Sequence, residues 1–311
     1  MNNIQHQQQV QKATKKAFGR KKTLKGKTTT RYPASAEREY IRLTRQYMKL
    51  ADDMLDKELP IIIKEYRRGS RTDARFDGTA DFKQALECAF LKMNVRLAKK
   101  LEKFGLTKKL KKLSRLVRKS ALREWKRACK RTLNIDVDEK HYNESFYGVE
   151  IDAWISNNLL KVSNLPSDAL RETKELLIEE YDNGTPLNEA AEKVKERRKA
   201  DNNYAACIAA SQIALLFAQM TKRQQQDAGV TSYVWQSTGD ERVRECHRTL
   251  NGNIFKWDEP PEMWYTTVSR GVVRTGRHCN PGEDYMCRCC AVPVFDKTTL
   301  NIPIENETRG S

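Results

Sequence analysis

The sequence has no apolar run that approaches the ~18 residues a membrane-spanning helix needs, and no apolar N-terminal stretch typical of a signal peptide. We therefore expect a cytoplasmic protein without a membrane partner. The sequence also lacks a glycine-rich phosphate loop, a Walker-type motif, a pair of C-x-x-C motifs and internal repeats. These absences argue against a P-loop nucleotide-binding enzyme and leave any zinc site without the usual strong signature.

A disulfide framework is not expected either, although the chain has eight cysteines. Cys88, Cys129 and Cys207 are scattered through helical patterns, where a cysteine is usually a small buried hydrophobe. The other five lie between residues 246 and 290, whereas a framework of bridges would be spread more evenly and would not survive in a reducing cytosol.

Acidic residues are scarce in the first half of the chain. Residues 1–140 contain 38 Lys and Arg against 16 Asp and Glu, while residues 141–311 contain 20 against 25. The whole chain carries a net charge of +17, and its 39% apolar residues predict a soluble protein with a modest core. A basic half joined to a mildly acidic half indicates that the first half contacts a polyanion or an acidic protein. The alternative is that the basic surface only aids solubility.

The most basic segments predict two contact regions. No acid precedes Glu37, so we expect residues 1–34 to form a disordered basic arm. A helix over 107–131 follows later, and only one acid, Glu124, offsets the thirteen basic residues between Lys103 and Arg131. We expect these segments to contact DNA or an acidic partner rather than to be merely solvated. The candidate contact residues are Lys15, Lys16, Arg20, Lys21, Lys22, Lys108, Lys109, Lys111, Lys112, Arg115, Arg118 and Lys119.

Hydrophobic periodicity predicts an α+β protein, mostly helical, with a small β-rich module at its C-terminal end. We expect Pro60 to end the first helix, Ser167 to cap another, and Asn251-Gly252 to form a hairpin turn. The predicted helices cover 35–59, 81–104, 107–131, 149–162, 168–182, a stretch after Thr185-Pro186, and 201–227; the predicted strands cover 233–235, 254–257 and 291–295. The predicted organisation is a basic arm (1–34), a basic helical region (35–148), a second helical region (149–228), a β-rich Cys/His module (229–296) and a tail (297–311).

The β-rich module holds the chain's concentrated chemistry. Thiols and imidazoles cluster at Cys246-His247, His278-Cys279 and Cys287–Cys290, a pattern that indicates a metal-stapled module. A structural zinc ion needs four such ligands, and a sensible set is His247, Cys279, Cys287 and Cys289. The alternative is that the cysteines are reduced and partly buried, with His247 hydrogen-bonded to Asp240 or a backbone carbonyl.

A catalytic interpretation of the same residues is weak, because no third group can be placed to orient His247 as a base. The charged D-E-R-V-R segment, with Asp240, Arg242 and Arg244, can have a structural role instead. There Asp240 can pair with Arg288 of the C-R-C cluster through a bidentate bond. Such a pair would tie the first half of the module to the last.

Two ordered motifs, W-x-x-x-x-D-E-R-V-R-x-x-H-x-x-L-N-G and P-G-E-D-x-x-C-R-C-x-A-x-P, resemble the phage Mu F-like head morphogenesis family, the minor head proteins of tailed phages. The resemblance covers about residues 185–296 and leaves out the basic first half. Cys246, Cys279 and Cys290 are not part of the family pattern, which leaves the ligand set open. The matching positions are Trp235, Asp240, Arg242, Arg244, His247, Leu250, Gly252, Pro281, Gly282, Asp284, Cys287, Arg288, Cys289 and Pro293.

This resemblance implies a non-enzymatic, structural role inside the virion head, with assembly in the host cytoplasm. It implies the portal protein, the major capsid or scaffold protein and packaged double-stranded DNA as partners, and a part in DNA packaging or ejection. One rival is a zinc-supported, nuclease-like DNA-processing enzyme. The other is a nucleoid or RNA-binding adaptor unrelated to virions.

Overall fold

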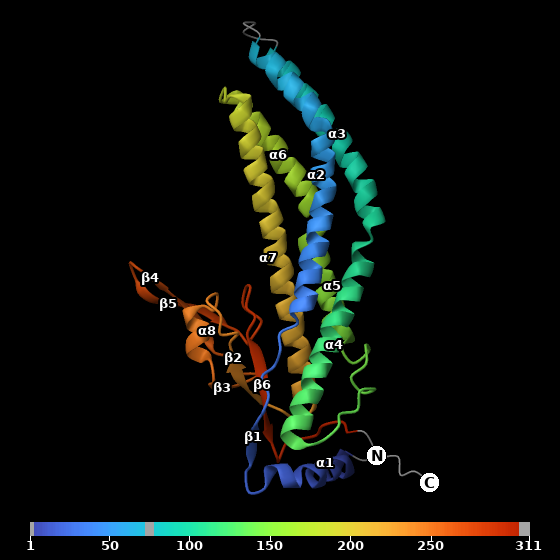
Figure 1. The fold of residues 1–311 in the computed structure, drawn as a ribbon, viewed down its shortest axis with the longest axis vertical. Helices are drawn as coiled ribbons and strands as arrows, with labels where there is room; N and C mark the ends of the chain where they lie inside the picture. The colour runs from blue at the N-terminus through green and yellow to red at the C-terminus, as the bar shows by residue number, and fades with distance from the viewer. Residues whose placement is uncertain (1–2, 72–77, 305–311) are drawn as a thin grey trace. The chain divides into compact units, whose positions relative to one another are not determined.

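The computed structural model describes residues 3–71 and 78–304 of the chain. It is an α+β protein with a mostly helical N-terminal region and antiparallel β-sheets towards the C-terminus (Figure 1), which confirms the predicted fold class. The chain divides into two compact units built from interleaved segments. A sheet unit comprises Met1–Glu37, Lys112–Trp154 and Ala210–Ser311, and a helical unit comprises Arg38–Lys111 and Ile155–Ala209.

Long helices supply most of the helical unit. One core packs α2 and α3 against α6 and the start of α7, with Leu55, Leu86, Leu97 and Leu177 among its buried side chains. The long helices of the chain are α2 (Ala34–Arg71), α3 (Gly78–Phe104), α4 (Leu106–Leu133), α5 (Gly148–Val162), α6 (Leu165–Asp182) and α7 (Leu187–Asp227). Of these, α3 and α6 lie wholly in the helical unit, and the other four have residues in both units. Gly105 and Gly184, both with positive φ, follow α3 and α6 as helix-ending glycines do.

Three predicted helix boundaries were wrong. Pro60 lies inside α2, because apolar side chains such as Ile62 and Tyr66 continue the buried stripe beyond it. Helix α6 begins at Leu165 after Asn164, with Pro166 in its first turn, rather than after Ser167. The two helices expected between residues 187 and 227 are one, since no glycine or proline interrupts the polar stretch between their apolar parts.

The expected disordered arm is folded over its described residues. Residues Asn3–Phe18 form α1, whose buried Val10, Thr14 and Phe18 recur at a helical spacing that the glutamine-rich, polar composition obscured. Thr23–Lys25 then form the short strand β1. The basic residues expected to contact DNA remain exposed on this segment.

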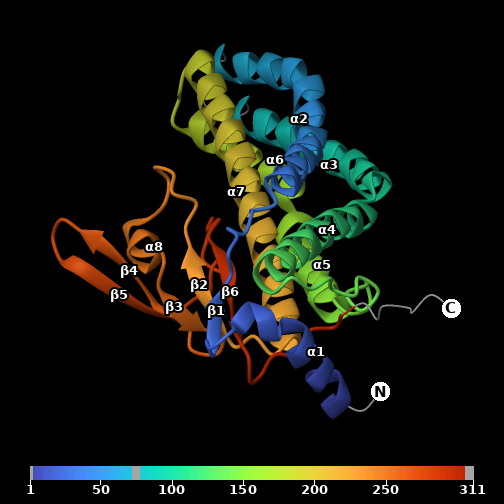
Figure 2. The same ribbon diagram turned by 60° about the horizontal axis from the view of Figure 1, so that its bottom comes forward.

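The sheet unit is built on four antiparallel strands in the order β1-β6-β2-β3 (Figure 2). Strands β2 (Ser232–Gln236), β3 (Ile254–Lys256) and β6 (Cys290–Asp296) correspond to the three predicted strands. Strand β6 is buried along almost its whole length and pairs with β2 on one side and β1 on the other, with Leu24 opposite Phe295. The first strand of the chain is therefore hydrogen-bonded to the last.

Two elements of this unit were not predicted. A two-stranded hairpin of β4 (Glu262–Thr267) and β5 (Gly271–His278) projects from the side of the unit that carries α8 (Figures 1 and 2). Helix α8 (Glu245–Leu250) precedes Asn251-Gly252. The turn at Asn251-Gly252 was predicted correctly, but it joins a helix to β3 rather than two strands of a hairpin.

One helix, α7, is long and apolar enough to cross a membrane by length and composition alone. Two thirds of its apolar window, 67%, is buried inside the protein. That burial is what the core helix of a folded domain shows, and it accounts for the apolar composition without a bilayer.

Candidate metal centre

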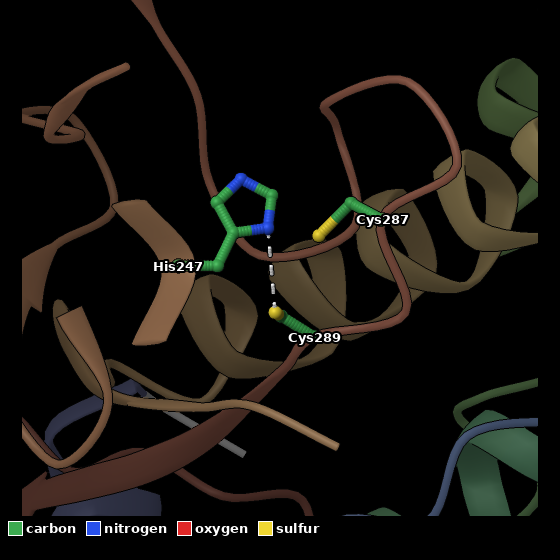
Figure 3. A group of neighbouring side chains, drawn as sticks. All are labelled: His247, Cys287 and Cys289. Atoms are coloured by element: carbon green, nitrogen blue, oxygen red, sulfur yellow. Dashed lines mark hydrogen bonds between the residues drawn. The ribbon is translucent and has the colours of Figure 1, made fainter. Parts of the chain in front are cut away.

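Three side chains with soft metal-binding atoms meet in the sheet unit. His247 lies on α8, and Cys287 and Cys289 lie in the segment between β5 and β6. One ligand atom from each falls within 4.8 Å of the others, and all three side chains are buried (Figure 3). Imidazole and thiolate are the ligands that zinc prefers, so this group can hold a metal ion.

The two ring nitrogens of His247 face different partners. Nδ1 lies 3.8 Å from Sγ of Cys289, the contact drawn in Figure 3. Nε2 lies 3.3 Å from Oδ2 of Asp284, close enough for an ion pair although not aligned as a hydrogen bond. A carboxylate on the far nitrogen fixes the ring orientation of metal-bound histidines in proteins. The residues therefore fit a metal that is held through Nδ1.

Asp284 is itself held by two arginines. Nη1 of Arg244 donates to its Oδ2 at 2.6 Å, and Nη1 of Arg277 donates to its Oδ1 at 3.1 Å. Burial opposes ionisation of Asp284, but its contact with His247 and the charge of Arg244 outweigh burial and lower its pKa to about 2. The carboxylate that orients His247 is thus charged at neutral pH.

The thiols are unequal in the absence of a metal. A hydrogen bond with Cys289 lowers the pKa of Cys287 well below its usual value, against burial and with help from His247. The same bond raises the pKa of Cys289. Burial alone would lower the pKa of His247, but Asp284 and Cys287 raise it to about 9. A thiolate is the metal-binding form of cysteine, so Cys287 is prepared to bind a cation.

The other cysteines of the module lie outside this group. Cys279 is buried in the core cluster with Tyr233, Trp257 and Met263, and burial raises its pKa to about 11. Cys246 belongs to the same cluster. Of the four ligands proposed from the sequence, the structure brings together three and leaves Cys279 apart.

The expected link between the two halves of the module is present. Nη2 of Arg288 lies 2.5 Å from Oδ2 of Asp240, as a single contact rather than a bidentate one. His247 does not bond to Asp240, the partner expected in a metal-free site. Its carboxylate partner is Asp284, which sequence reasoning missed as an orienting group even though it lies in the P-G-E-D segment.

A pocket of about 250 Å³ opens beside the three candidate ligands. All three line it, together with Asp240 and Glu37. Three arginines, Arg242, Arg244 and Arg288, also line the wall of the pocket. The candidate metal centre is therefore buried at its core but adjoins a cavity with charged walls.

The predicted DNA-contact residues lie on separate segments. Lys15 and Lys16 are on α1, and Arg20, Lys21 and Lys22 follow it. The other seven lie along α4, where the buried positions Leu110, Leu113 and Val117 form the opposite stripe. Some of the seven have partners inside the protein: Arg115 pairs with Glu144, Arg118 donates to the Tyr142 carbonyl, and Nζ of Lys109 lies over the ring of Phe104.

Part of the chain is similar to known proteins. Residues 172–292 match the family model described as "Phage Mu protein F like protein". An uncharacterized protein of Haemophilus influenzae is 25% identical over 181 residues, which is 57% of this chain and 37% of that relative. The chain thus spans little more than a third of the relative's length. No solved structure matches the chain.

Proposed function

Because residues 172–292 carry the module of the phage Mu protein F-like family, we propose that this chain is a minor head protein of a tailed phage. In this role it is a non-enzymatic component of the virion interior, associated with the portal, that aids head assembly and DNA packaging or ejection. The match supports the proposal because it covers α8, strands β2 to β5, the start of β6 and the Cys/His group together.

Mass spectrometry of purified heads, followed by cross-linking to the portal protein and to the capsid or scaffold protein, tests this role. The chain should be present in low copy in intact heads and should cross-link to the portal. Absence from purified particles would overturn the proposal.

The proposed DNA contact runs along α4. Lys108, Lys112 and Lys119 are exposed there, with no acidic partner found among the described residues. Each phosphate that the protein no longer neutralises should reduce the slope of log affinity against log salt by about 0.9. Replacing these three lysines with glutamine should therefore weaken binding to any double-stranded sequence and flatten that slope.

A charge-matched control for this experiment uses lysines that already have acidic partners. Lys49 pairs with Asp53, Lys83 with Asp182, and Lys195 with Glu192. Replacing these three with glutamine removes the same charge and should leave the salt slope nearly unchanged. Equal effects of the two triple variants would reduce the proposed contact to a general effect of net charge.

The proposed cofactor is a zinc ion bound by Nδ1 of His247 and the sulfurs of Cys287 and Cys289. The chain loaded with Co²⁺ should show thiolate-to-cobalt absorption that Cys289→Ser removes. Cys279→Ser should leave that absorption in place, because Cys279 lies outside the group. Loss of the band in both variants would show that the ligand set is wrong.

One observation favours a second candidate, a metal-supported DNA-processing enzyme. Catalytic zinc sites keep three protein ligands and an open position, and the three ligands here line a pocket. Metal-dependent cleavage of plasmid DNA that is lost in His247→Ala would establish this activity. Intact plasmid after incubation with the zinc-loaded chain would leave the structural role as the better account.

A further inference from the structure

The candidate metal group offers three ligands where a tetrahedral ion takes four. Among the residues that the structure describes, His247, Cys287 and Cys289 are the group that meets the spacing for a shared ion. Asp284 is engaged elsewhere, since it holds the far nitrogen of His247 and accepts from Arg244 and Arg277. The fourth ligand must therefore come from outside the group.

The pocket is where such a ligand can enter. All three candidate ligands form part of its wall, so an ion held between them faces the cavity. Its volume of about 250 Å³ is several times the ~30 Å³ that one water molecule occupies in the liquid. There is room for a small polyatomic ligand, not only for a water molecule.

The arginines on the wall include one whose donors are available to an anion. Two thiolates balance a divalent ion, and Arg244 and Arg288 are paired with Asp284 and Asp240. Arg242 also lines the pocket, and no ion pair of its guanidinium is found in the described part of the chain. Its planar donors suit an oxyanion such as phosphate.

Glu37 restricts which anions can bind in the pocket. Its side chain lines the same pocket; a side-chain hydrogen bond with Tyr32 engages the carboxylate, but its Oε2 is buried without a hydrogen-bond partner of its own. A carboxylate oxygen can only accept, so an anion beside it must itself carry an O–H group. Inorganic phosphate keeps at least one proton at neutral pH, whereas sulfate and carboxylate ligands do not, and a phosphate monoester, whose second pKa is about 6, keeps its proton only in mildly acidic solution.

We propose that the metal held by His247, Cys287 and Cys289 keeps one coordination position open to the pocket, and that a protonated phosphoryl group binds there. Arg242 donates to its oxygens, and Glu37 accepts its O–H. This proposal rests on the metal centre proposed above. Free phosphate offers this group at neutral pH, whereas the terminal phosphate of a nucleic acid strand offers it only when protonated, below a pKa of about 6.

The test uses the full chain loaded with Co²⁺, freed of unbound metal and titrated while the visible d–d absorption is recorded. Inorganic phosphate should shift the spectrum saturably, and sulfate should need at least tenfold higher concentration because it lacks the proton. Glu37→Gln should narrow the gap between the two anions. A short 5′-phosphorylated oligonucleotide, compared with its 5′-hydroxyl form, shows whether a strand end can supply the group.

Matched variants separate the site from general charge. Arg242→Gln should raise the phosphate midpoint about tenfold, the size expected for one charge-assisted hydrogen bond, and Arg242→Lys should restore part of the affinity. Arg270→Gln removes the same charge at the turn of the β4–β5 hairpin, away from the pocket, and should have no effect.

The outcomes distinguish the two proposals. If no cobalt binds, the metal centre itself is wrong. If cobalt binds through the thiolates but phosphate leaves the spectrum unchanged, the metal centre stands and the open phosphoryl position is overturned. If sulfate acts as strongly as phosphate, the assignment of a protonated ligand facing Glu37 is overturned.

Discussion

Nε2 of His247 lies 3.3 Å from Oδ2 of Asp284, and both side chains are at most 6% exposed. The ring's other nitrogen is thereby directed at the two thiols, as in histidines that bind metal with a carboxylate behind them. Residues far apart in the sequence thus form one continuous chain of contacts from carboxylate to imidazole to sulfur.

Asp284→Asn should weaken metal binding without removing a ligand. The amide keeps the shape of the side chain but loses the charge that stabilises and orients His247, and losses of about 10–100-fold are typical for such partners. Competition with a chromogenic chelator measures the affinity. Glu241→Gln is the control, because this exposed neighbour of Asp240 neither lines the pocket nor belongs to the ligand group. An unchanged affinity in Asp284→Asn would mean that Asp284 serves folding alone.

Arg288→Lys should destabilise the sheet unit modestly. The Arg288–Asp240 contact joins the segment before β6 to the loop before α8, but its side chains are 29% and 42% exposed. Partly exposed pairs contribute at most about 1 kcal/mol. Thermal unfolding should therefore show a small fall in Tm, whereas an unchanged Tm would show that the pair does not tie the module together.

Glycines in the sequence predicted several helix ends, because a glycine ends a helix through its own backbone conformation. Gly105, Gly184 and Gly229 all adopt positive φ where the pattern placed helix ends. Pro60 failed as a signal because packing of the apolar residues on both sides of it holds the helix together. Tertiary contacts of α2 therefore outweighed the tendency of Pro60 to end the helix.

Contacts between residues that are far apart in the sequence could not be predicted from the periodicity of apolar residues. Nothing near Thr23–Lys25 indicates that its partner is the last strand of the chain. Three of the four proposed ligands meet, but the sequence could not separate Cys279 from Cys287 and Cys289, since all three are buried cysteines of one module. Asp284 was visible in the motif, and only the fold shows that it faces His247.

Gly229→Ala should be far more damaging than Gly239→Ala. Both glycines have φ near +74°, so both substitutions carry the same backbone strain of about 1–2 kcal/mol. A Cβ at Gly229 would lie 1.9 Å from the carbonyl oxygen of Thr299, whereas a Cβ at Gly239 meets nothing within 4 Å. Displacing that backbone should cost about 1–3 kcal/mol more. Urea unfolding of the two variants measures the difference, and equal stabilities would contradict the close approach of the 299–301 segment to the end of α7.

Glu180→Gln should make the stability of the helical unit less sensitive to acid. Oε2 of Glu180 accepts from Nζ of Lys193 at 2.6 Å and from Oγ1 of Thr185 at 2.7 Å. The hydrogen bond from Lys193, followed by that from Thr185, lowers the pKa of Glu180 below its usual value of 4.5. A depressed folded-state pKa contributes stability that is complete above the unfolded value and is lost as pH falls through the folded one.

The wild type should therefore be more stable than Glu180→Gln at pH 7, and the gap in Tm should shrink once the pH falls below about 4.5, the usual pKa of a glutamate side chain. Glu179→Gln is the matched control, because Glu179 is an exposed neighbour on the same helix. Its effect should be small and should not follow this pattern. A gap between wild type and Glu180→Gln that stays constant between pH 7 and pH 3.5 would show that the Lys193 contact stabilises the fold through packing rather than through the charge of Glu180.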